Sequence, residues 1–168
     1  MTDLERRIDR IESRASIMDL AARYFIATDV DDTETVMACF AADASFLVSG
    51  QLCGEGSDNI RDFLVSARSG MGMTVHVHNS CVIDFEGPDQ ATGVVTAHLE
   101  LVLQDVPVYG AVRYHDRYAR RDGAWKIISR DMKVVYLAEW ADAPRALSST
   151  TPVRWPGAPE GASDIPRP

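Results

Sequence analysis

The chain has 168 residues, of which 46% are hydrophobic and 25% are charged, with a formal net charge of −8 at pH 7. This length suits one domain, and the composition lets the chain bury a sizeable core, which excludes a disordered protein. The acidic surplus argues against binding to nucleic acid or to an anionic membrane surface, because both require clustered Lys and Arg. We therefore expect a small-molecule partner.

The cysteines and the apolar segments give further expectations. Cys39, Cys53 and Cys81 are odd in number and have no paired spacing, so no disulfide framework is expected. A reducing cytoplasm is the simplest setting for such thiols. The N-terminal segment carries charge throughout, unlike a signal peptide, and no stretch approaches the roughly 18 apolar residues of a membrane-spanning helix. The sequence therefore predicts a cytoplasmic protein with no membrane partner.

The first segment is predicted to be a helix that ends near Thr28. Its apolar residues recur at alternating steps of four and three, which is typical of one helix face. These residues are Leu4, Ile8, Ile11, Ala15, Met18, Ala22 and Phe25. The first ten residues can project from the domain and contact another subunit. Asp32 can cap a short second helix, and Asp58 can cap a third that ends at Gly70.

The rest of the domain is predicted to be β structure. A short strand at residues 44–48 precedes a loop punctuated by Gly50, Gly54 and Gly56. Turn signals at 86–89, 105–107 and Asp122-Gly123 separate four long strands. The predicted ranges of these strands are 73–85, 91–104, 108–120 and 124–136. Strands of this length must twist and curl, and a curled sheet encloses space.

The C-terminal segment differs from the rest of the chain. Six of the eight prolines follow Ala138, namely Pro144, Pro152, Pro156, Pro159, Pro166 and Pro168. They predict an irregular tail over residues 139–168, which is not a separate domain and which lies over the pocket or over a neighbouring subunit. Residues 1–138 are expected to form one α+β domain. In it, N-terminal helices pack on a strongly curved antiparallel or mixed sheet that encloses a pocket.

Three polar residues stand out as candidates for chemistry. Asp29 follows the long predicted helix, and taken alone it is more often a solvated or capping carboxylate than a catalytic one. His76 and His78 share one face of a predicted strand. Such a pair can bind zinc or iron, but no further ligand at a familiar spacing completes a set, so no metal site is predicted. A base polarised by a carboxylate and a structural histidine remain the alternatives.

Other residues allow both a structural and a functional interpretation. Tyr24 can donate a hydrogen bond to a substrate oxygen or pack in the core. Tyr114 raises the same choice as Tyr24. His98 belongs to a polar row that faces either solvent or the pocket. Arg130, between apolar neighbours, either snorkels or points its cation into a cavity. No phosphate loop, dinucleotide-binding turn, nucleophile elbow or Cys-x-x-Cys pair is present, so no cofactor is expected.

Four segments in this order resemble one family. They are RYFIATD at 23–29, FAADA at 40–44, TVH at 74–76 and YARRDGAWKI at 118–127. The pattern spans about residues 5–136 and resembles the SnoaL-like branch of the nuclear transport factor 2-like superfamily. Within that branch it is similar to scytalone dehydratase, bile-acid 7α-dehydratase and hexachlorocyclohexane dehydrochlorinase. The resemblance implies a cone-shaped α+β barrel with the site inside the cone.

The resemblance also implies roles for individual residues. In those enzymes an Asp–His dyad removes a proton from carbon, and Asp29 and His76 match its two members. Tyr24 matches the dehydratase tyrosine, a position at which the dehydrochlorinase has lysine. The remaining expected contacts are with the substrate, and several of these residues lie at pocket positions of the family. The expected substrate-binding residues are His98, Tyr114, Arg130, Phe25 and Met132.

Three functional hypotheses follow. The first is a lyase, a cofactor-independent dehydratase acting on a small, largely apolar cyclic substrate of polyketide or steroid type. The second is an isomerase or polyketide cyclase that uses the same base. The third is a non-catalytic protein that binds a small ligand or resembles the small subunit of a dioxygenase, because fold alone does not settle function. The resemblance further implies a homo-oligomer, either a trimer or a dimer.

Overall fold

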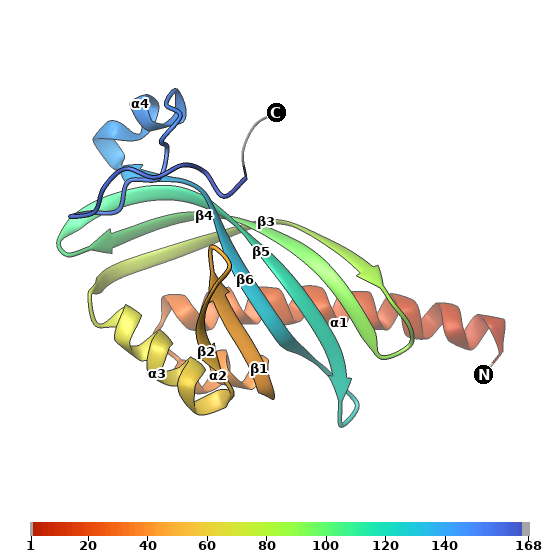
Figure 1. Ribbon diagram of the computed structural model, residues 1–168. Coiled ribbons are helices and arrows are strands. Elements are labelled where there is room, and N and C mark those ends of the chain that lie inside the picture. The colour runs from red at the N-terminus through yellow and green to blue at the C-terminus, as the bar shows by residue number, and fades with distance from the viewer. Residues whose placement is uncertain (1, 166–168) are drawn as a thin grey trace.

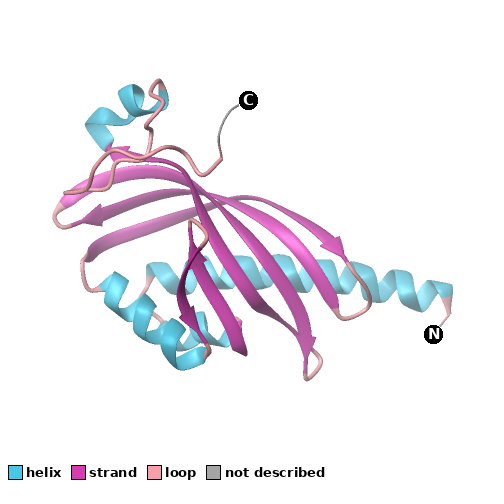
Figure 2. Ribbon diagram, in the orientation of Figure 1, coloured by secondary structure: helices cyan, strands magenta, loops and turns pink. Residues whose placement is uncertain are grey.

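The computed structural model describes residues 2–165 and has an α+β architecture, in which a long helix crosses one face of a curved sheet (Figures 1 and 2). The helices are α1 (Asp3–Asp29), α2 (Thr33–Ala38), α3 (Ser57–Arg68) and α4 (Ala143–Leu147), with a 3₁₀ turn at Trp140–Asp142. The strands are β1 (Phe40–Val48), β2 (Gln51–Glu55), β3 (Met71–Phe85), β4 (Gln90–Leu103), β5 (Val106–Arg121) and β6 (Ala124–Glu139).

The sheet has six strands in the order β2-β1-β6-β5-β4-β3. All neighbours are antiparallel except β1 and β6, which run parallel. The long strands β3 to β6 curl over α1, while α2 and α3 lie beside β1 and β2 at one end (Figure 1). The predicted fold class is therefore confirmed as a cone-like arrangement of helices on a mixed sheet. The sheet is curved but not closed into a complete barrel.

Helix α1 begins with a capping box, in which Thr2 Oγ1 accepts from the Glu5 backbone N–H and the Glu5 carboxylate accepts from the Thr2 N–H. Its first turns extend past the sheet, as Figure 1 shows. Leu4 and Ile11 of the predicted apolar stripe are accordingly exposed there. The buried face of α1 begins at Ser13 and Ile17, which are not in the predicted stripe. Phe25 is the one stripe residue that is buried, so the stripe does not mark the core face of the helix.

The segment after β1 differs from its prediction. Residues 51–55 form strand β2 where a loop was expected, and α3 begins at Ser57 without a side-chain cap from Asp58. A Cβ atom on Gly54 would lie 2.9 Å from the backbone of Asn59. Glycine at this position therefore marks the close approach of β2 to α3 and does not mark a loop.

The hairpins of the long strands follow the turn signals closely. The turn at 122–123 has φ of +50° at Asp122 and +80° at Gly123, as a type I′ hairpin requires. The turn between β4 and β5 lies at Gln104 and Asp105, one residue earlier than predicted, and both have positive φ. The tail continues past β6, and its Pro166 and Pro168 lie outside the described residues. Cys39, Cys53 and Cys81 are free thiols.

Within residues 2–165, no helix has both the length and the apolarity needed to cross a membrane.

Candidate active site

A cavity of about 590 Å³ lies between the helices and the curled sheet. Apolar side chains from α2, β1, β4 and β6 form much of its wall, including Val36, Phe46, Leu99, Leu101 and Met132. A pocket of a few hundred cubic ångströms with few polar groups is typical of small-molecule sites. The predicted pocket is therefore present and apolar in character.

The cavity wall contains His76, whose ring is held by Asp29 from behind. Asp29 Oδ1 lies 2.6 Å from His76 Nδ1, and Asp29 Oδ2 accepts a hydrogen bond of 2.9 Å from the His76 backbone N–H. Asp29 ends α1 and His76 lies in β3, so the contact joins elements that are 47 residues apart. Both carboxylate oxygens are used, and this fixes the orientation of the imidazole relative to the strand.

The hydrogen bond also determines which nitrogen of His76 can act as a base. A carboxylate only accepts hydrogen bonds, so we assign the ring proton to Nδ1. The lone pair is then on Nε2, which remains free for a molecule in the cavity. Phe25 packs against the imidazole with a centroid separation of 5.3 Å and an interplanar angle of 23°. The ring is thus held by a carboxylate at its edge and by an aromatic face.

The environment of His76 keeps its imidazole neutral. Burial disfavours the imidazolium and lowers the pKa of His76 below its ordinary value, although Asp29 opposes this by favouring the charged form. An imidazole that is neutral at pH 7 can accept a proton. The dyad therefore has the protonation state that a general base requires.

The lowered pKa of His76 predicts how the stability of the protein, and any activity that uses His76 as a base, depend on pH. We expect kcat/KM to be constant near neutrality and to fall only as the pH drops below about 6.5, the ordinary pKa of histidine. The unfolded chain takes up this proton at its ordinary pKa, whereas the folded chain takes it up at lower pH, so this group also reduces stability as the pH falls below about 6.5. A pH–rate profile and an NMR titration of His76 measure both effects. A rate that already declines between pH 8 and 7 would contradict the assignment.

Tyr24 and Tyr114 also line the cavity, and a buried cation lies behind them. The Arg130 guanidinium carbon is 4.1 Å from the ring centroid of Tyr24 and 4.6 Å from that of Tyr114. Burial raises the pKa of Tyr24, and the positive charge of Arg130 partly offsets this rise. The Tyr24 phenol is therefore a neutral hydrogen-bond donor at the wall of the cavity.

Arg130 is fully buried and is paired with Asp116. Its Nε and Nη2 donate to the two oxygens of Asp116 at 2.9 and 2.7 Å, and Tyr118 donates to the same carboxylate at 2.7 Å. Burial by itself lowers the pKa of Arg130, but the adjacent Asp116 more than compensates and keeps it well above the ordinary value. This fixed ion pair supports the aromatic wall formed by Tyr24 and Tyr114.

Three of the expected substrate-binding residues lie elsewhere. His98 is on the face of β4 that points away from the cavity, where it stacks on Tyr109 and its Nδ1 lies 2.9 Å from Asn79 Oδ1. The expectation that His98 binds substrate is therefore corrected, because the polar row of β4 faces outward. Phe25 and Arg130 lie behind the cavity wall, and only Tyr114 and Met132 of that group line it.

The structure also places residues at the cavity that the sequence did not indicate. Arg68, at the end of α3, and Asp31, after α1, line the wall as an ion pair with a contact of 2.5 Å. Arg68 also donates to the buried Thr74 at 3.2 Å. Trp155 reaches the cavity from the C-terminal tail. No sequence pattern predicts such a role for a helix-terminal arginine, and Trp155 lies in a tail that was predicted only to be irregular.

His78 lies beside the dyad but forms no metal site with it. Its Nε2 is buried without a hydrogen-bond partner, and its ring packs against Phe25. Across residues 2–165, no three side chains among His, Cys, Asp and Glu are grouped as metal ligands would be.

Comparisons with known proteins place this geometry in a family. The model of the SnoaL-like domain matches residues 9–131. The γ-hexachlorocyclohexane dehydrochlorinase of Sphingobium indicum is 26% identical over 137 residues, which cover 80% of this chain and 88% of that protein. Hexachlorocyclohexane dehydrochlorinase 1 of the same species is 27% identical over 123 residues, covering 71% and 80%.

Solved structures share the fold. The crystal structure of LinA superposes with a TM-score of 0.76 at 24% identity, covering 81% of this chain and 95% of that one. A scytalone dehydratase-like protein of Novosphingobium aromaticivorans gives a TM-score of 0.74 at 17% identity, covering 80% and 91%. The domain model matches most of the chain, and the solved structures share its fold. This protein therefore belongs to the SnoaL-like family of the nuclear transport factor 2-like superfamily.

Proposed function

We propose that the protein is a cofactor-independent lyase, which removes water from a small, largely apolar cyclic alcohol. The observation that carries the proposal is the 2.6 Å contact between Asp29 and His76 Nδ1 at the wall of an apolar cavity. A non-catalytic ligand carrier has no need of a neutral imidazole held by a carboxylate inside its pocket. The relationship to dehydrochlorinases, which are lyases, supports the same reaction class.

The reaction begins with the transfer of a proton from carbon to His76. Nε2 accepts the proton, and the electron pair of the broken C–H bond forms the new double bond. The imidazolium formed at His76 lies against the Asp29 carboxylate, which stabilises the positive charge. General-base catalysis of this kind contributes about 10²–10⁴-fold to the rate.

The departing hydroxyl needs a proton to leave as water. The Tyr24 phenol transfers its proton to this oxygen as the C–O bond breaks, and one water molecule is released. His76 then gives up the proton taken from carbon and the Tyr24 phenolate takes up one proton through solvent, so the protein returns to its starting state. Tyr24 is suited to this role because Arg130 lies 4.1 Å from its ring and favours negative charge developing on its oxygen.

The mass of the product separates this reaction from its alternative. We expect cyclic alcohols with an activated C–H next to the carbon that bears the hydroxyl to lose 18 mass units when incubated with the protein. An isomerase using the same base would conserve the mass and, in deuterated water, would incorporate deuterium at carbon. Mass spectrometry of the products in H₂O and D₂O measures both. No change in any such alcohol, with the protein folded, would contradict the proposal.

Other expectations from the sequence stay predictions. These are the assembly into a dimer or trimer, the cytoplasmic location and the polyketide or steroid type of substrate. Met73 and Val77, on the outer side of β3, are exposed to 77% and 44%, which favours assembly through that face.

A further inference from the structure

Part of the cavity wall is formed by residues that lie outside the segment matched by the family's domain model. The domain model ends at residue 131, whereas Trp155 of the C-terminal tail lines the cavity together with Ser49 and Gln51. Trp155 is half-buried and packs against the core. The local structure of this proline-rich tail explains how it holds a large aromatic side chain at the cavity.

A tight hairpin presents Trp155. The sequence Trp155-Pro156-Gly157-Ala158 forms a turn in which the Ala158 N–H donates to the Trp155 carbonyl at 3.1 Å. Gly157 has φ of +73°, and proline precedes it, as a type II turn favours. On either side of the turn, Val153 and Gly161 pair with two backbone hydrogen bonds of 3.0 and 2.7 Å. Residues 153–161 are therefore an ordered hairpin.

The main body of the protein binds this hairpin through its backbone. Val153 pairs in parallel with Leu137 of β6, and Leu137 accepts a hydrogen bond of 2.7 Å from the Arg154 N–H. Further along the tail, the Asp164 carboxylate accepts from the Val134 N–H at 2.8 Å and from Ser49 Oγ at 2.5 Å. The hairpin is thus attached to β6 and to the turn after β1, at the edge of the cavity.

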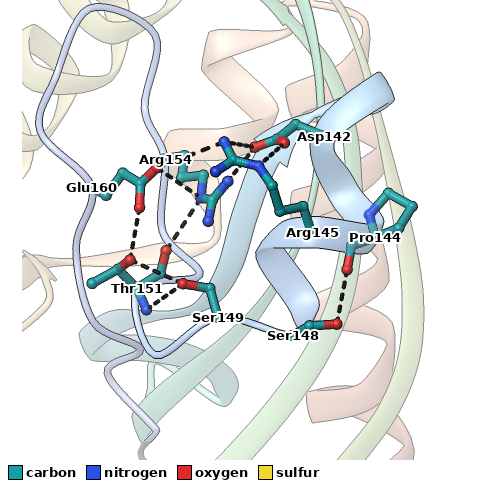
Figure 3. A network of polar contacts seen from close by, with 8 residues as sticks. All are labelled: Asp142, Pro144, Arg145, Ser148, Ser149, Thr151, Arg154 and Glu160. Carbon is teal, nitrogen blue, oxygen red and sulfur yellow. Dashed lines mark hydrogen bonds and ion pairs between the residues drawn. The ribbon is translucent and has the colours of Figure 1, made fainter.

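A charged network fixes the residue next to Trp155. The Arg154 guanidinium lies between the carboxylates of Asp142 and Glu160, and it also donates to the Thr151 carbonyl at 3.3 Å (Figure 3). The Arg154 side chain is only 10% exposed. Side chains of consecutive extended residues point to opposite faces, so holding Arg154 in this network directs Trp155 to the other side, toward the cavity.

We propose that Trp155 is a ligand-binding residue, whose indole packs against the apolar ring of a molecule in the cavity. Trp155 lines the cavity and is only half-buried, so part of its indole is accessible to a ligand. A flat indole contributes large contact area and prefers rings as partners. The hairpin 153–161 then selects ring-bearing ligands. This inference rests on the proposed function only for identifying the ligand as a substrate.

The charges at the wall indicate that the ligand ring is neutral. Arg68 and Asp31, which both line the cavity, already neutralise each other at 2.5 Å. An anionic ligand would have to compete with Asp31 for Arg68, and a cationic one would have to compete with Arg68 for Asp31. A neutral ring leaves the pair intact and uses the apolar wall.

Binding of N-phenyl-1-naphthylamine, a neutral fluorescent molecule with linked aromatic rings, tests the proposal in the full-length protein. We expect the wild-type protein to bind it with partial quenching of tryptophan emission. Trp155→Ala should raise its Kd about tenfold, and Trp155→Phe, which retains a ring, about two- to threefold. Trp140→Ala is the matched control, because Trp140 is 64% exposed and packs on Tyr109 outside the cavity. It should leave the Kd unchanged.

The outcomes separate this inference from the proposed reaction. Thermal melting establishes that each variant is folded, and Trp155→Phe serves if Trp155→Ala melts early. Unchanged affinity in both Trp155 variants, or no binding by the wild-type protein, would overturn the role of Trp155. Probe binding that depends on Trp155, combined with no elimination of water from any alcohol, would overturn the proposed reaction and leave this inference standing.

Discussion

Replacing His76 with alanine is expected to reduce the rate of proton abstraction from carbon by about 10²–10⁴-fold, because the variant lacks the Nε2 atom that accepts the proton. Asp29→Asn should give a comparable loss for a different reason. Its amide oxygen can still accept from the His76 backbone N–H, but its amide nitrogen donates to Nδ1 and moves the ring proton to Nε2. The imidazole then stays in place in a form that cannot act as a base.

The measurement is single-turnover elimination, or hydrogen–deuterium exchange at carbon, with wild-type and variant proteins. His98→Ala is the matched control, since His98 lies on the outer face of β4 and stacks on Tyr109. It should retain the wild-type rate. Because Asp29→Asn preserves the shape of the side chain, its melting temperature should stay near that of the wild type. Full turnover in either dyad variant would refute the mechanism.

Removing the partner of Arg130 is expected to have the largest effect on stability. Asp116→Ala leaves a guanidinium, which is fully buried in the wild-type protein, without its carboxylate. An uncompensated buried charge typically costs about 3–5 kcal/mol in the free energy of unfolding. Tyr118 also loses the acceptor of its hydroxyl group. Because Arg130 lies against the rings of Tyr24 and Tyr114, we expect the aromatic wall of the cavity to loosen in the same variant.

Urea unfolding of Asp116→Ala measures the loss in the free energy of unfolding. The double variant Asp116→Leu/Arg130→Met is unfolded in the same way for comparison. Because the double variant has no unpaired charge, it should be more stable than Asp116→Ala. Glu34→Gln is the matched control, because Glu34 pairs with Arg61 at 2.5 Å but is 81% exposed. That change should cost less than about 1 kcal/mol. A loss in Asp116→Ala as small as in this control would show that the buried pair does not support the core.

The helices and long strands could be predicted because their signals are local. Periodicity identified α1, and turn residues such as Asp122-Gly123 separated the strands to within a few residues. Strand β2 was missed because its glycines resemble loop punctuation. Gly54 is needed there by the backbone of α3, which is a contact that a linear pattern does not contain.

The candidate site was only partly accessible from the sequence. Asp29 and His76 could be paired through the resemblance, not through periodicity, because 47 residues separate them. Alternation along β4 shows that the side chains of His98 and Leu99 point to opposite faces of the sheet, but it does not indicate which face curls around the cavity. Trp155 could not be placed at all, because its position depends on backbone pairing of the tail with Leu137.

The attachment of the tail has a consequence for the solubility of the protein. Strand β1 pairs with β6 only as far as Met132, and beyond that point the tail occupies the backbone groups of Val134 and Leu137 on the same side. An unoccupied row of N–H and C=O groups on a strand is a template for pairing with other chains. The segment around Pro152 and Asp164 therefore covers this strand edge, so the tail that completes the cavity also removes a template for strand pairing with other chains.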